Sequence, residues 1–299
     1  MRKFLVGLVV CITGLTSGLS WAGDEKGMAR RVEMLEKQVA ALHAEVKRLN
    51  GNTVLKLNHA VDLQNVDGQP TAIFSGINLQ VVNGTGDQFT LNGRGNLTVG
   101  YTSPRTFGDP ICSDGAFLTQ SDCESNRKIW GMHHTSGSHN LLLGTGNSYS
   151  NQGAIIGGSH NAVNAPSSSI LGGWGNVAGA IVTSILGGGH NTAIKEGATM
   201  SGGLNNRGEG FYSSLGGGVF NTTNGDHSVV SAGAHNQTTG AFSTVSGGTG
   251  NLASGDYAVV SGGGSNTASG VGSSVTGFAH ITAIHDWATC PDLNYCFQP

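Results

Sequence analysis

The chain has 299 residues, of which 50 are glycine and only 11% are charged. No Gly-X-Y triplet accompanies this glycine content, so a collagen-like chain is excluded. A net charge of −3 and an isoelectric point near 6.4 leave no basic footprint for nucleic acid or for a membrane surface. We therefore expect a weakly charged, repetitive fold with no nucleic-acid partner.

Residues 1–22 have the pattern of a secretory signal peptide. Arg2 and Lys3 precede an apolar stretch at 4–19, and the small-x-small triplet that ends at Ala22 provides a cleavage site. A transmembrane anchor is the alternative, but the apolar run is short and is broken by threonine and serine. We predict a mature chain without a transmembrane segment, exported to the periplasm, the cell surface or the extracellular space.

Four cysteines remain after that cleavage, in two local pairs: Cys112 with Cys123, and Cys290 with Cys296. Four cysteines allow three pairings, and an oxidising compartment favours disulfides between near neighbours. A zinc site is the alternative, but neither pair has the two-residue spacing of a zinc ribbon. We predict two small disulfide loops, with no metal and no other cofactor.

Residues 24–50 are predicted to form a helix with a coiled-coil seam, because apolar residues alternate by four and three along it. The seam residues are Met28, Val32, Leu35, Val39, Leu42, Val46 and Leu49. Valine at a and leucine at d leans towards a dimer. However, the run from Arg31 to Glu36, with Val32 and Leu35 between them, resembles a short trimerisation motif. We expect a trimer; the alternative is an amphipathic helix packed on its own domain.

Residues 51–100 are predicted to be a connector followed by the first β rungs. The runs 71–74, 78–82 and 88–91 are strand-like and are separated by Asn-Gly turn signals.

The segment 101–138 is predicted to be an insertion between two adjacent rungs, because residues 96–100 and 140–144 have similar sequences. A loop of this length is usually functional or disordered. A disulfide across its base favours an ordered, protruding loop. Its candidate recognition residues are Trp130, His133 and His134. The two adjacent histidines could bind a metal, but neighbouring side chains seldom converge, so we interpret them as solvated.

Residues 139–280 repeat with a period of 15, the signature of a solenoid in which each repeat is one rung. The marker residues are Asn161, Asn176, Asn191, Asn206, Asn221, Asn236, Asn251 and Asn266. Counting each asparagine as position 0, position 7 is small, position 9 is large and apolar, and position 11 is almost always glycine. This alternation has the period of a strand, so positions 7, 9 and 11 are predicted to face the interior. A second strand is expected near position 2.

Turn-forming residues lie between these predicted strands. Position 4 is glycine in five rungs. The residue before each asparagine is often His, Gly or Asn, which are frequent at positive φ, so this column is predicted to be a left-handed turn position. Its histidines could instead form a metal ladder, but His160 and His190 are two rungs, or about 10 Å, apart.

The asparagine column is predicted to be structural, because side chains at equal height in successive rungs can hydrogen-bond to one another along the stack. Catalysis is not expected. The six charged residues between 161 and 280 form no recurring pair of facing carboxylates. The serines and threonines lack histidine and acid partners that would activate a nucleophile.

Each rung offers one large apolar side chain, so a single chain buries little, and association through the helix would supply further cover. The runs 228–233 and 260–270 look like the head repeats of trimeric autotransporter adhesins, the YadA-like left-handed parallel β-roll. The resemblance covers about 140–280 and implies a homotrimer that binds host matrix or other surfaces. The rung here is slightly longer, and we expect no C-terminal membrane-anchoring strands.

Residues 281–299 are predicted to be a disulfide-closed cap over the last rung.

The sequence therefore predicts a mainly β protein, a parallel β-solenoid preceded by a short trimeric coiled coil. Its expected function is that of an exported, non-catalytic, adhesin-like homotrimer that binds a glycan, matrix or cell-surface ligand. The alternative is a structural or filament-forming extracellular protein without a specific ligand; an ice-binding surface would need a regular Thr-x-Thr column, which is not found.

Overall fold

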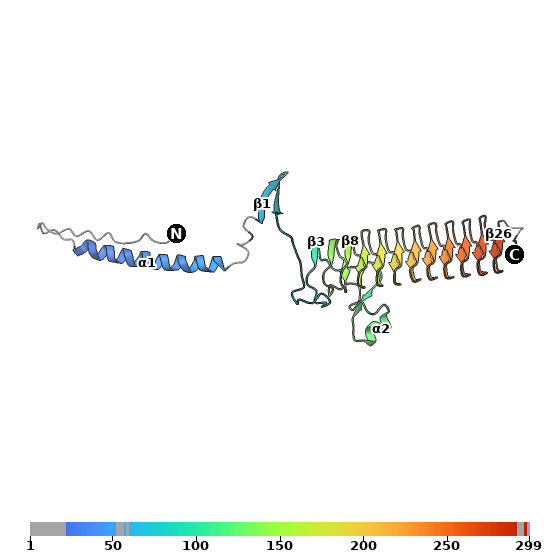
Figure 1. Cartoon of the computed structure of the whole chain (residues 1–299), viewed down its shortest axis with the longest axis horizontal. Helices are drawn as coiled ribbons and strands as arrows, with labels where there is room; N and C mark the ends of the chain where they lie inside the picture. The colour runs from blue at the N-terminus through green and yellow to red at the C-terminus, as the bar shows by residue number, and fades with distance from the viewer. Residues whose placement is uncertain (1–21, 52–56, 58–59, 292–295, 298–299) are drawn as a thin grey trace. The chain divides into compact units, whose positions relative to one another are not determined.

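The computed structural model of the chain describes residues 22–51, 57, 60–291 and 296–297. Of the predicted signal peptide, residues 1–22, only Ala22 falls within these ranges. The chain divides into two compact units, Met1–Leu79 and Gln80–Pro299. In Figure 1 the first contains a helix and a hairpin, and the second is a stack of rungs.

The first unit contains the predicted helix. α1 spans Ala22–Asn50, which confirms a helix at 24–50, and the seven predicted seam residues are 37–63% exposed. β1 (Val61–Val66) and β2 (Gln69–Phe74) pair antiparallel. Asp67 and Gly68 connect them with φ values of 50° and 81°, as a two-residue hairpin turn requires. The predicted strand at 71–74 therefore lies in this hairpin and forms no rung.

The second unit is a parallel β-solenoid, and its regular rungs pair residues 15 apart, such as Leu215 with Val230. The longer sheet has 12 strands: β3 (Leu97–Tyr101), β6 (Leu141–Thr145), β8 (Ile155–Ser159), β10 (Ser169–Ile170), β12 (Ser184–Ile185), β14 (Thr199–Met200), β16 (Ser214–Leu215), β18 (Val229–Val230), β20 (Thr244–Val245), β22 (Val259–Val260), β24 (Ser274–Val275) and β26 (Thr289–Cys290).

The shorter sheet has 10 strands: β7 (Ser148–Tyr149), β9 (Ala162–Val163), β11 (Val177–Ala178), β13 (Thr192–Ala193), β15 (Arg207–Gly208), β17 (Thr222–Thr223), β19 (Gln237–Thr238), β21 (Leu252–Ala253), β23 (Thr267–Ala268) and β25 (Thr282–Ala283). Isolated parallel bridges at position 13 form a third ladder between Trp174 and Ala279. The predicted parallel solenoid is thus confirmed.

The core lies between the two sheets. The position 9 side chains are at most 2% exposed: Ile170, Ile185, Met200, Leu215, Val230, Val245, Val260 and Val275. Small residues at positions 2 and 7 are also buried, which lets the sheets approach closely. Position 11 differs, because Gly172 and Gly217 are half-buried. The prediction that position 11 faces the interior is wrong, because each regular strand has only two residues and the chain turns before it.

Three columns of each rung adopt the left-handed conformation, and one of them is the glycine column at position 12, with φ of 82° at Gly173 and 88° at Gly218. The column before the asparagine does so as predicted, with φ of 56° at His160 and 57° at Phe220. Position 6 forms a further left-handed column that the sequence did not reveal, with φ of 59° at Val182 and 58° at Phe242. A β-branched residue at positive φ is strained, so the neighbouring rungs must hold this backbone in place.

The position 4 glycines lie at bends between the strands, as predicted, but a left-handed backbone is not the reason for glycine there. Gly225 is not at positive φ. A Cβ built there would overlap the carbonyl of Gly240 in the next rung. Glycine is needed at position 4 because successive backbones approach closely there.

The asparagine column is buried, at most 1% exposed, but its hydrogen bonds differ from the predicted pattern. The Oδ1 of Asn221 accepts a bond from the backbone N–H of Asn236 at 2.9 Å. Its Nδ2 donates to the carbonyls of Gly217 and Gly233 at 2.9 and 2.8 Å. Each side chain therefore joins its own rung to the next through the backbone, which satisfies three polar groups at once.

A direct side-chain bond between members of this column is described for Asn206 and Asn191, at 3.1 Å. The column begins with Asn147, whose Oδ1 accepts from the backbone N–H of Asn161. It ends at Ile281, whose backbone N–H donates to Asn266.

β3 and β6 are neighbours in the longer sheet and pair in register from Leu97 with Leu141 to Tyr101 with Thr145. The two similar sequence segments are thus adjacent rungs, and the chain between them leaves the stack and returns. This insertion contains β4 (Ile111–Cys112), α2 (Gln120–Ser125) and β5 (Trp130–Gly131). β4 and β5 pair antiparallel, and Cys112 is bonded to Cys123.

Residues 78–82 and 88–91, which the sequence predicted as strands, have no strand structure. The side chain of Asn83 holds this segment in a turn, because its Nδ2 donates to the carbonyls of Asp87 and Thr90. These local bonds replace the rung-to-rung pairing expected here.

The stack extends one rung further than predicted, through β25 and β26. Cys290 occupies position 9 and is fully buried, so the predicted boundary at 280 is too early. The Cys290–Cys296 disulfide is present as predicted. Phe297 then pairs antiparallel with Thr289 through two backbone hydrogen bonds of 2.9 and 2.8 Å. This short antiparallel pairing covers part of the open edge of the last rung.

Candidate functional site

The insertion is anchored on the stack by Arg105, which is 2% exposed. Its guanidinium donates to the carbonyls of His160 and Asp109, each at 2.7 Å, and of Met132 at 3.2 Å. Burial lowers the pKa of Arg105 to about 10, and the negative charge of Asp109 opposes that shift. The side chain thus joins two parts of the insertion to a rung edge.

Further contacts hold the insertion against the outer face of the shorter sheet. Ile111 packs in a buried cluster with Ala162 and Val177. Asp109 accepts a hydrogen bond from the hydroxyl of Thr192 at 3.0 Å and lies 3.6 Å from the guanidinium of Arg207. The insertion is therefore ordered and lies flat over several rungs, and α2 projects from them (Figure 1).

The predicted recognition residues do not form one surface. His133 accepts a hydrogen bond at Nδ1 from the backbone N–H of Arg105, and Nε2 of His134 lies 3.1 Å from the carbonyl oxygen of Ile111. Burial lowers the pKa of both histidines, assisted at His133 by the charges of His134 and Arg105. The histidines position the insertion and are not simply solvated, whereas Trp130 lines a hollow.

Three adjoining hollows lie along the side of the insertion that faces the later rungs. They measure 420, 300 and 260 Å³. The first and second share Leu118, Gly179 and Ile194, and the second and third share Asp109, Thr192 and Arg207. Together they form one groove, here called the transverse groove, that crosses the outer face of the shorter sheet from one rung edge to the other.

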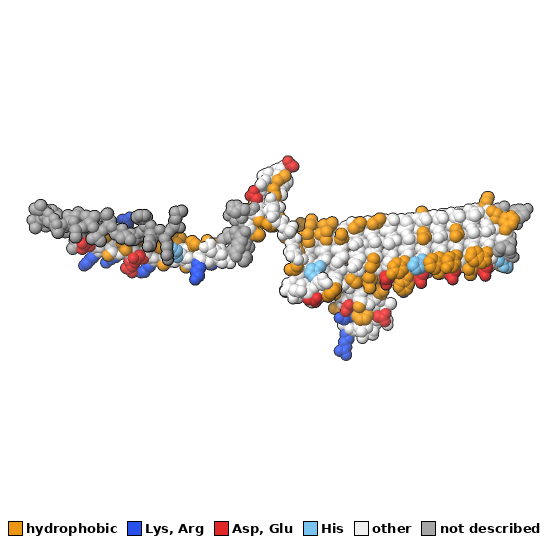
Figure 2. Space-filling model, in the orientation of Figure 1, with side chains coloured by type: hydrophobic (Ala, Val, Ile, Leu, Met, Phe, Trp, Pro, Cys, Tyr) orange, Lys and Arg blue, Asp and Glu red, His pale blue; other side chains and the backbone are white. Residues whose placement is uncertain are grey.

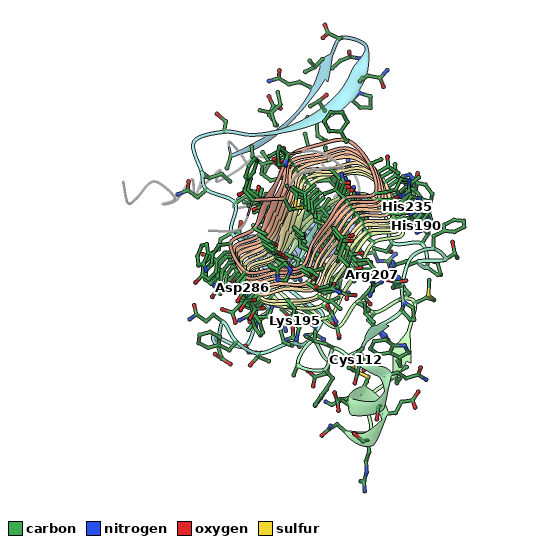
Figure 3. All side chains as sticks on the ribbon, turned by 90° about the vertical axis from the view of Figure 1, so that its right-hand side faces the viewer. Cys112, His190, Lys195, Arg207, His235 and Asp286 are labelled. Carbon is green, nitrogen blue, oxygen red and sulfur yellow. A yellow bond between two sulfur atoms is a disulfide. The ribbon has the colours of Figure 1, made fainter. Side chains whose placement is uncertain are left out.

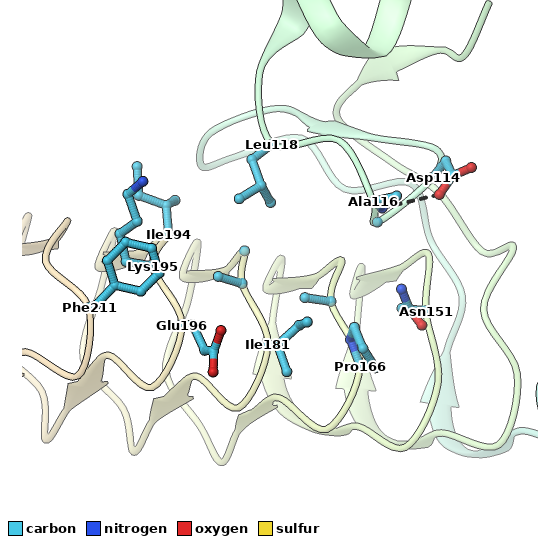
Figure 4. A pocket seen from close by; sticks show the side chains of 14 residues that line it. Asp114, Ala116, Leu118, Asn151, Pro166, Ile181, Ile194, Lys195, Glu196 and Phe211 are labelled. Carbon is cyan, nitrogen blue, oxygen red and sulfur yellow. Dashed lines mark hydrogen bonds between the residues drawn. The ribbon is translucent and has the colours of Figure 1, made fainter. Parts of the chain in front are cut away.

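Figure 4 shows the first hollow, with Leu118 of the insertion facing Ile194, Lys195 and Phe211 of the rungs. The Nζ of Lys195 lies 5.0 Å from the centre of the Phe211 ring. This end of the groove is therefore mostly apolar, with one ammonium group at its rim.

The other end of the groove is more polar. His190, Asn205 and Phe220 line the third hollow at the opposite rung edge. In Figure 3, which looks along the stack, His190 and Lys195 lie at opposite edges, and Arg207 lies on the face between them. The groove thus begins and ends at rung edges and is open at both ends.

Other charged side chains of the repeats have structural partners. The carboxylates of Asp226 and Asp256 each accept a backbone N–H from the preceding rung, at 3.0 and 2.9 Å. Glu196 accepts a 2.6 Å hydrogen bond from the Tyr212 hydroxyl, which raises the pKa of that tyrosine. Among the described residues, no group of three His, Cys, Asp or Glu side chains is arranged to hold a metal.

One rung edge carries a column of stacked rings. Tyr212, His227, Phe242 and Tyr257 follow one another with centroid separations of 5.5, 4.9 and 5.1 Å. Figure 2 shows hydrophobic, acidic and histidine side chains along this margin. Because each ring face is covered by its neighbour, the column is a poor platform for a ligand.

The predicted trimerisation residues lie on α1. Val32 and Leu35 are both 54% exposed, and they border an apolar hollow with Glu36 and Val39. Arg31 and Glu36 have no ion-pair partner among the described residues. In the described part of the chain, no helix has the length and apolarity needed to cross a membrane.

Sequence reasoning missed Arg207, Phe211 and Phe220 as groove residues. A signal was available, because four of the six charged residues of 161–280 lie between 195 and 209. Departures from the repeat are thus concentrated beside the insertion.

Comparison of the sequence with protein families and with curated proteins gives no match. The geometry of the rungs, the insertion and the helix therefore carries the functional argument.

Proposed function

We propose that the protein is an exported, non-catalytic homotrimer that presents its solenoid for binding to a surface ligand, in the manner of trimeric adhesins. The observation that carries this proposal is the uncovered seam of α1. Seven apolar side chains with coiled-coil spacing face solvent. Most helical stability in proteins comes from packing of the apolar face, so a helix with an uncovered apolar seam needs partner helices.

A second uncovered apolar area supports association of the solenoids. On the outer face of the longer sheet, position 10 is apolar in the early rungs, where Leu171 is 53% and Leu186 is 52% exposed. Later rungs have small or polar residues at this position: Ser201, Gly216, Ser231, Ser246, Ser261 and Thr276. Patches of this kind on exported proteins mark interaction sites, so we expect the copies to meet over the early rungs.

The proposal places ligand binding in the transverse groove. A concave site lined by apolar side chains and a few convergent polar groups is the usual form of a binding site. The alternative, a filament-forming protein without a ligand, would need an open last rung, and Phe297 covers part of that edge.

Two measurements test the proposal on the mature chain. Sedimentation equilibrium at micromolar concentration should give a trimer, and Leu35→Asp with Leu42→Asp should give monomers. Binding to extracellular matrix or to cell surfaces should be lost when residues 101–138 are deleted. A monomeric wild-type protein, or surface binding that survives the deletion, would contradict the proposal.

A further inference from the structure

We infer that the transverse groove binds a neutral, linear oligosaccharide and contacts sugar units in the interior of that chain. This inference rests on the proposed function and specifies the chemistry of its ligand. It is carried by the shape of the groove, by the hydrogen bonds of its floor and by the balance of its charges.

The shape of the groove favours a linear ligand. A rung crosses from His190 at one end to Glu196 at the other in six residue steps, so the groove spans at most about 20 Å. Both ends open at rung edges. A chain can therefore lie across the stack and continue beyond it at either side, so binding needs no free chain terminus.

The floor of the groove excludes recognition of an extended peptide by strand addition. The backbone N–H of Val177 donates to Asn191 at 2.8 Å, and that of Thr192 donates to Asn206 at 2.9 Å. β13 pairs with strands on both sides. Because strand addition needs unpaired backbone groups at a sheet edge, the side chains must supply the contacts to the ligand.

Those side chains suit a sugar chain, whose residues have an apolar C–H face and hydroxyl groups around it. Phe211 is 41% and Phe220 is 50% exposed, one near each end, and the half-buried Trp130 lies in the wall between them. One face of Phe220 is stacked on His235, so a ligand would meet the exposed remainder of that ring. Amphipathic ligands pack on such rings while polar groups fix their orientation. Asn205 and His190 offer donors and acceptors beside Phe220.

The charges along the groove are balanced. The guanidinium of Arg207 lies 3.6 Å from Asp109 and 2.7 Å from Glu209. Lys128 is paired with Asp114 at 3.0 Å, and Lys195 is adjacent to Glu196. Without an uncompensated cationic cluster the groove has no attraction for sulfated or sialylated chains, so a neutral ligand fits best.

Calorimetric titration of the full mature chain tests the inference. The probes are neutral hexasaccharides of glucose, mannose, galactose or N-acetylglucosamine, sulfated and sialylated oligosaccharides, and extended hexapeptides. At least one neutral hexasaccharide should bind, and more tightly than its disaccharide. Phe211→Ala and Phe220→Ala should each weaken binding roughly tenfold. Phe242→Ala is the matched control, because its ring is 49% exposed but lies outside the groove, and it should leave the affinity unchanged.

Three results would overturn the inference: no neutral oligosaccharide binds at millimolar concentration, binding is insensitive to both groove variants, or the charged sugars or peptides bind better. If the protein nevertheless sediments as a trimer and binds surfaces through residues 101–138, the proposed function stands and only the ligand class is wrong. If trimerisation or surface binding also fails, both are wrong.

Discussion

The outer face of the shorter sheet occurs in two forms in one molecule. Over the early rungs the insertion covers it, and Ala162 and Val177 are at most 3% exposed. Over the later rungs, at Thr222, Gln237 and Leu252, the equivalent residues are half-buried and carry no covering segment among the described residues. The backbone underneath has the same path in both, so the two forms differ in their side chains and in the cover that the insertion provides.

This difference separates the structural part of the molecule from its candidate binding part. In the later, uncovered rungs, here called the bare rungs, the hydrogen bonds join neighbours about 15 residues apart, as at Asn221 and Asn236. In the covered rungs they also join distant residues, such as Thr192 with Asp109, 83 residues away. Changes in the bare rungs should therefore alter stability, and changes in the covered rungs should alter binding. Four experiments test this distinction.

The largest effect is expected for Asn221→Leu in the bare rungs. Leucine leaves one buried N–H and two carbonyls without the partners that Asn221 provides, so the free energy of unfolding should fall by about 3–5 kcal/mol. Urea unfolding measures the change. Thr222→Leu, on the outer side of the same rung, is the control and should change it by about 0.5 kcal/mol or less. Equal stability of Asn221→Leu and the wild type would contradict a structural role of the column.

Removal of the Cys112–Cys123 disulfide should affect the covered region alone. With both cysteines replaced by serine, the cross-link over 11 residues is lost, and local opening of the insertion should become easier by about 2–3 kcal/mol. Hydrogen exchange should show faster exchange at residues 105–134 and unchanged rates at residues 221–275. A matching loss of protection in the later rungs would mean that the two regions are not independent.

Two glycines of adjacent rungs should respond oppositely to alanine. A Cβ at Gly225 overlaps the carbonyl of Gly240, whereas a Cβ at Gly217 meets no atom within 4 Å. Gly225→Ala should therefore destabilise the chain by about 1–3 kcal/mol. Gly217→Ala should change stability little or raise it by about 0.5 kcal/mol. Thermal unfolding of the two variants compares them, and similar losses in both would rule out close backbone approach as the reason for glycine at position 4.

The smallest effect is a pH dependence confined to the insertion. Burial holds the pKa of His133 and His134 below the ordinary value of 6.5. As pH falls below that value, the unfolded segment takes up protons before the folded one does, so the insertion loses stability until its lowered pKa values are passed. Hydrogen exchange at residues 105–134 should accelerate in this range, and the response should shrink in His133→Asn. An unchanged response in that variant would exclude His133 as a cause.

The sequence predicted the solenoid well because the repeat itself carries the information. Asparagine at position 0 and large apolar residues at position 9 set the register. His and Gly before the asparagine identified one left-handed column. The left-handed column at position 6 was missed because Val182, Phe242 and Trp287 are residues seldom found at positive φ. Pairing with neighbouring rungs overrides that local preference.

The candidate site was predicted only in part. Local similarity between two rungs located the insertion and its disulfide, but no period relates Asp109 to Thr192, so the path of the insertion over the rungs could not be read from the pattern. His133 and His134 drew attention because histidines often bind ligands. Their hydrogen bonds to Arg105 and Ile111 instead hold the insertion in place.

The equivalence of the later rungs has a consequence for how such a chain can change over time. Each rung contacts its two neighbours, and a unit of 15 residues begins and ends at the same point of the backbone path. Duplication or loss of one unit would lengthen or shorten the stack by about 4.8 Å without altering the groove. The distance between the transverse groove and the far end of the stack could therefore vary through copying errors in repeated DNA, while the residues of the groove stay the same.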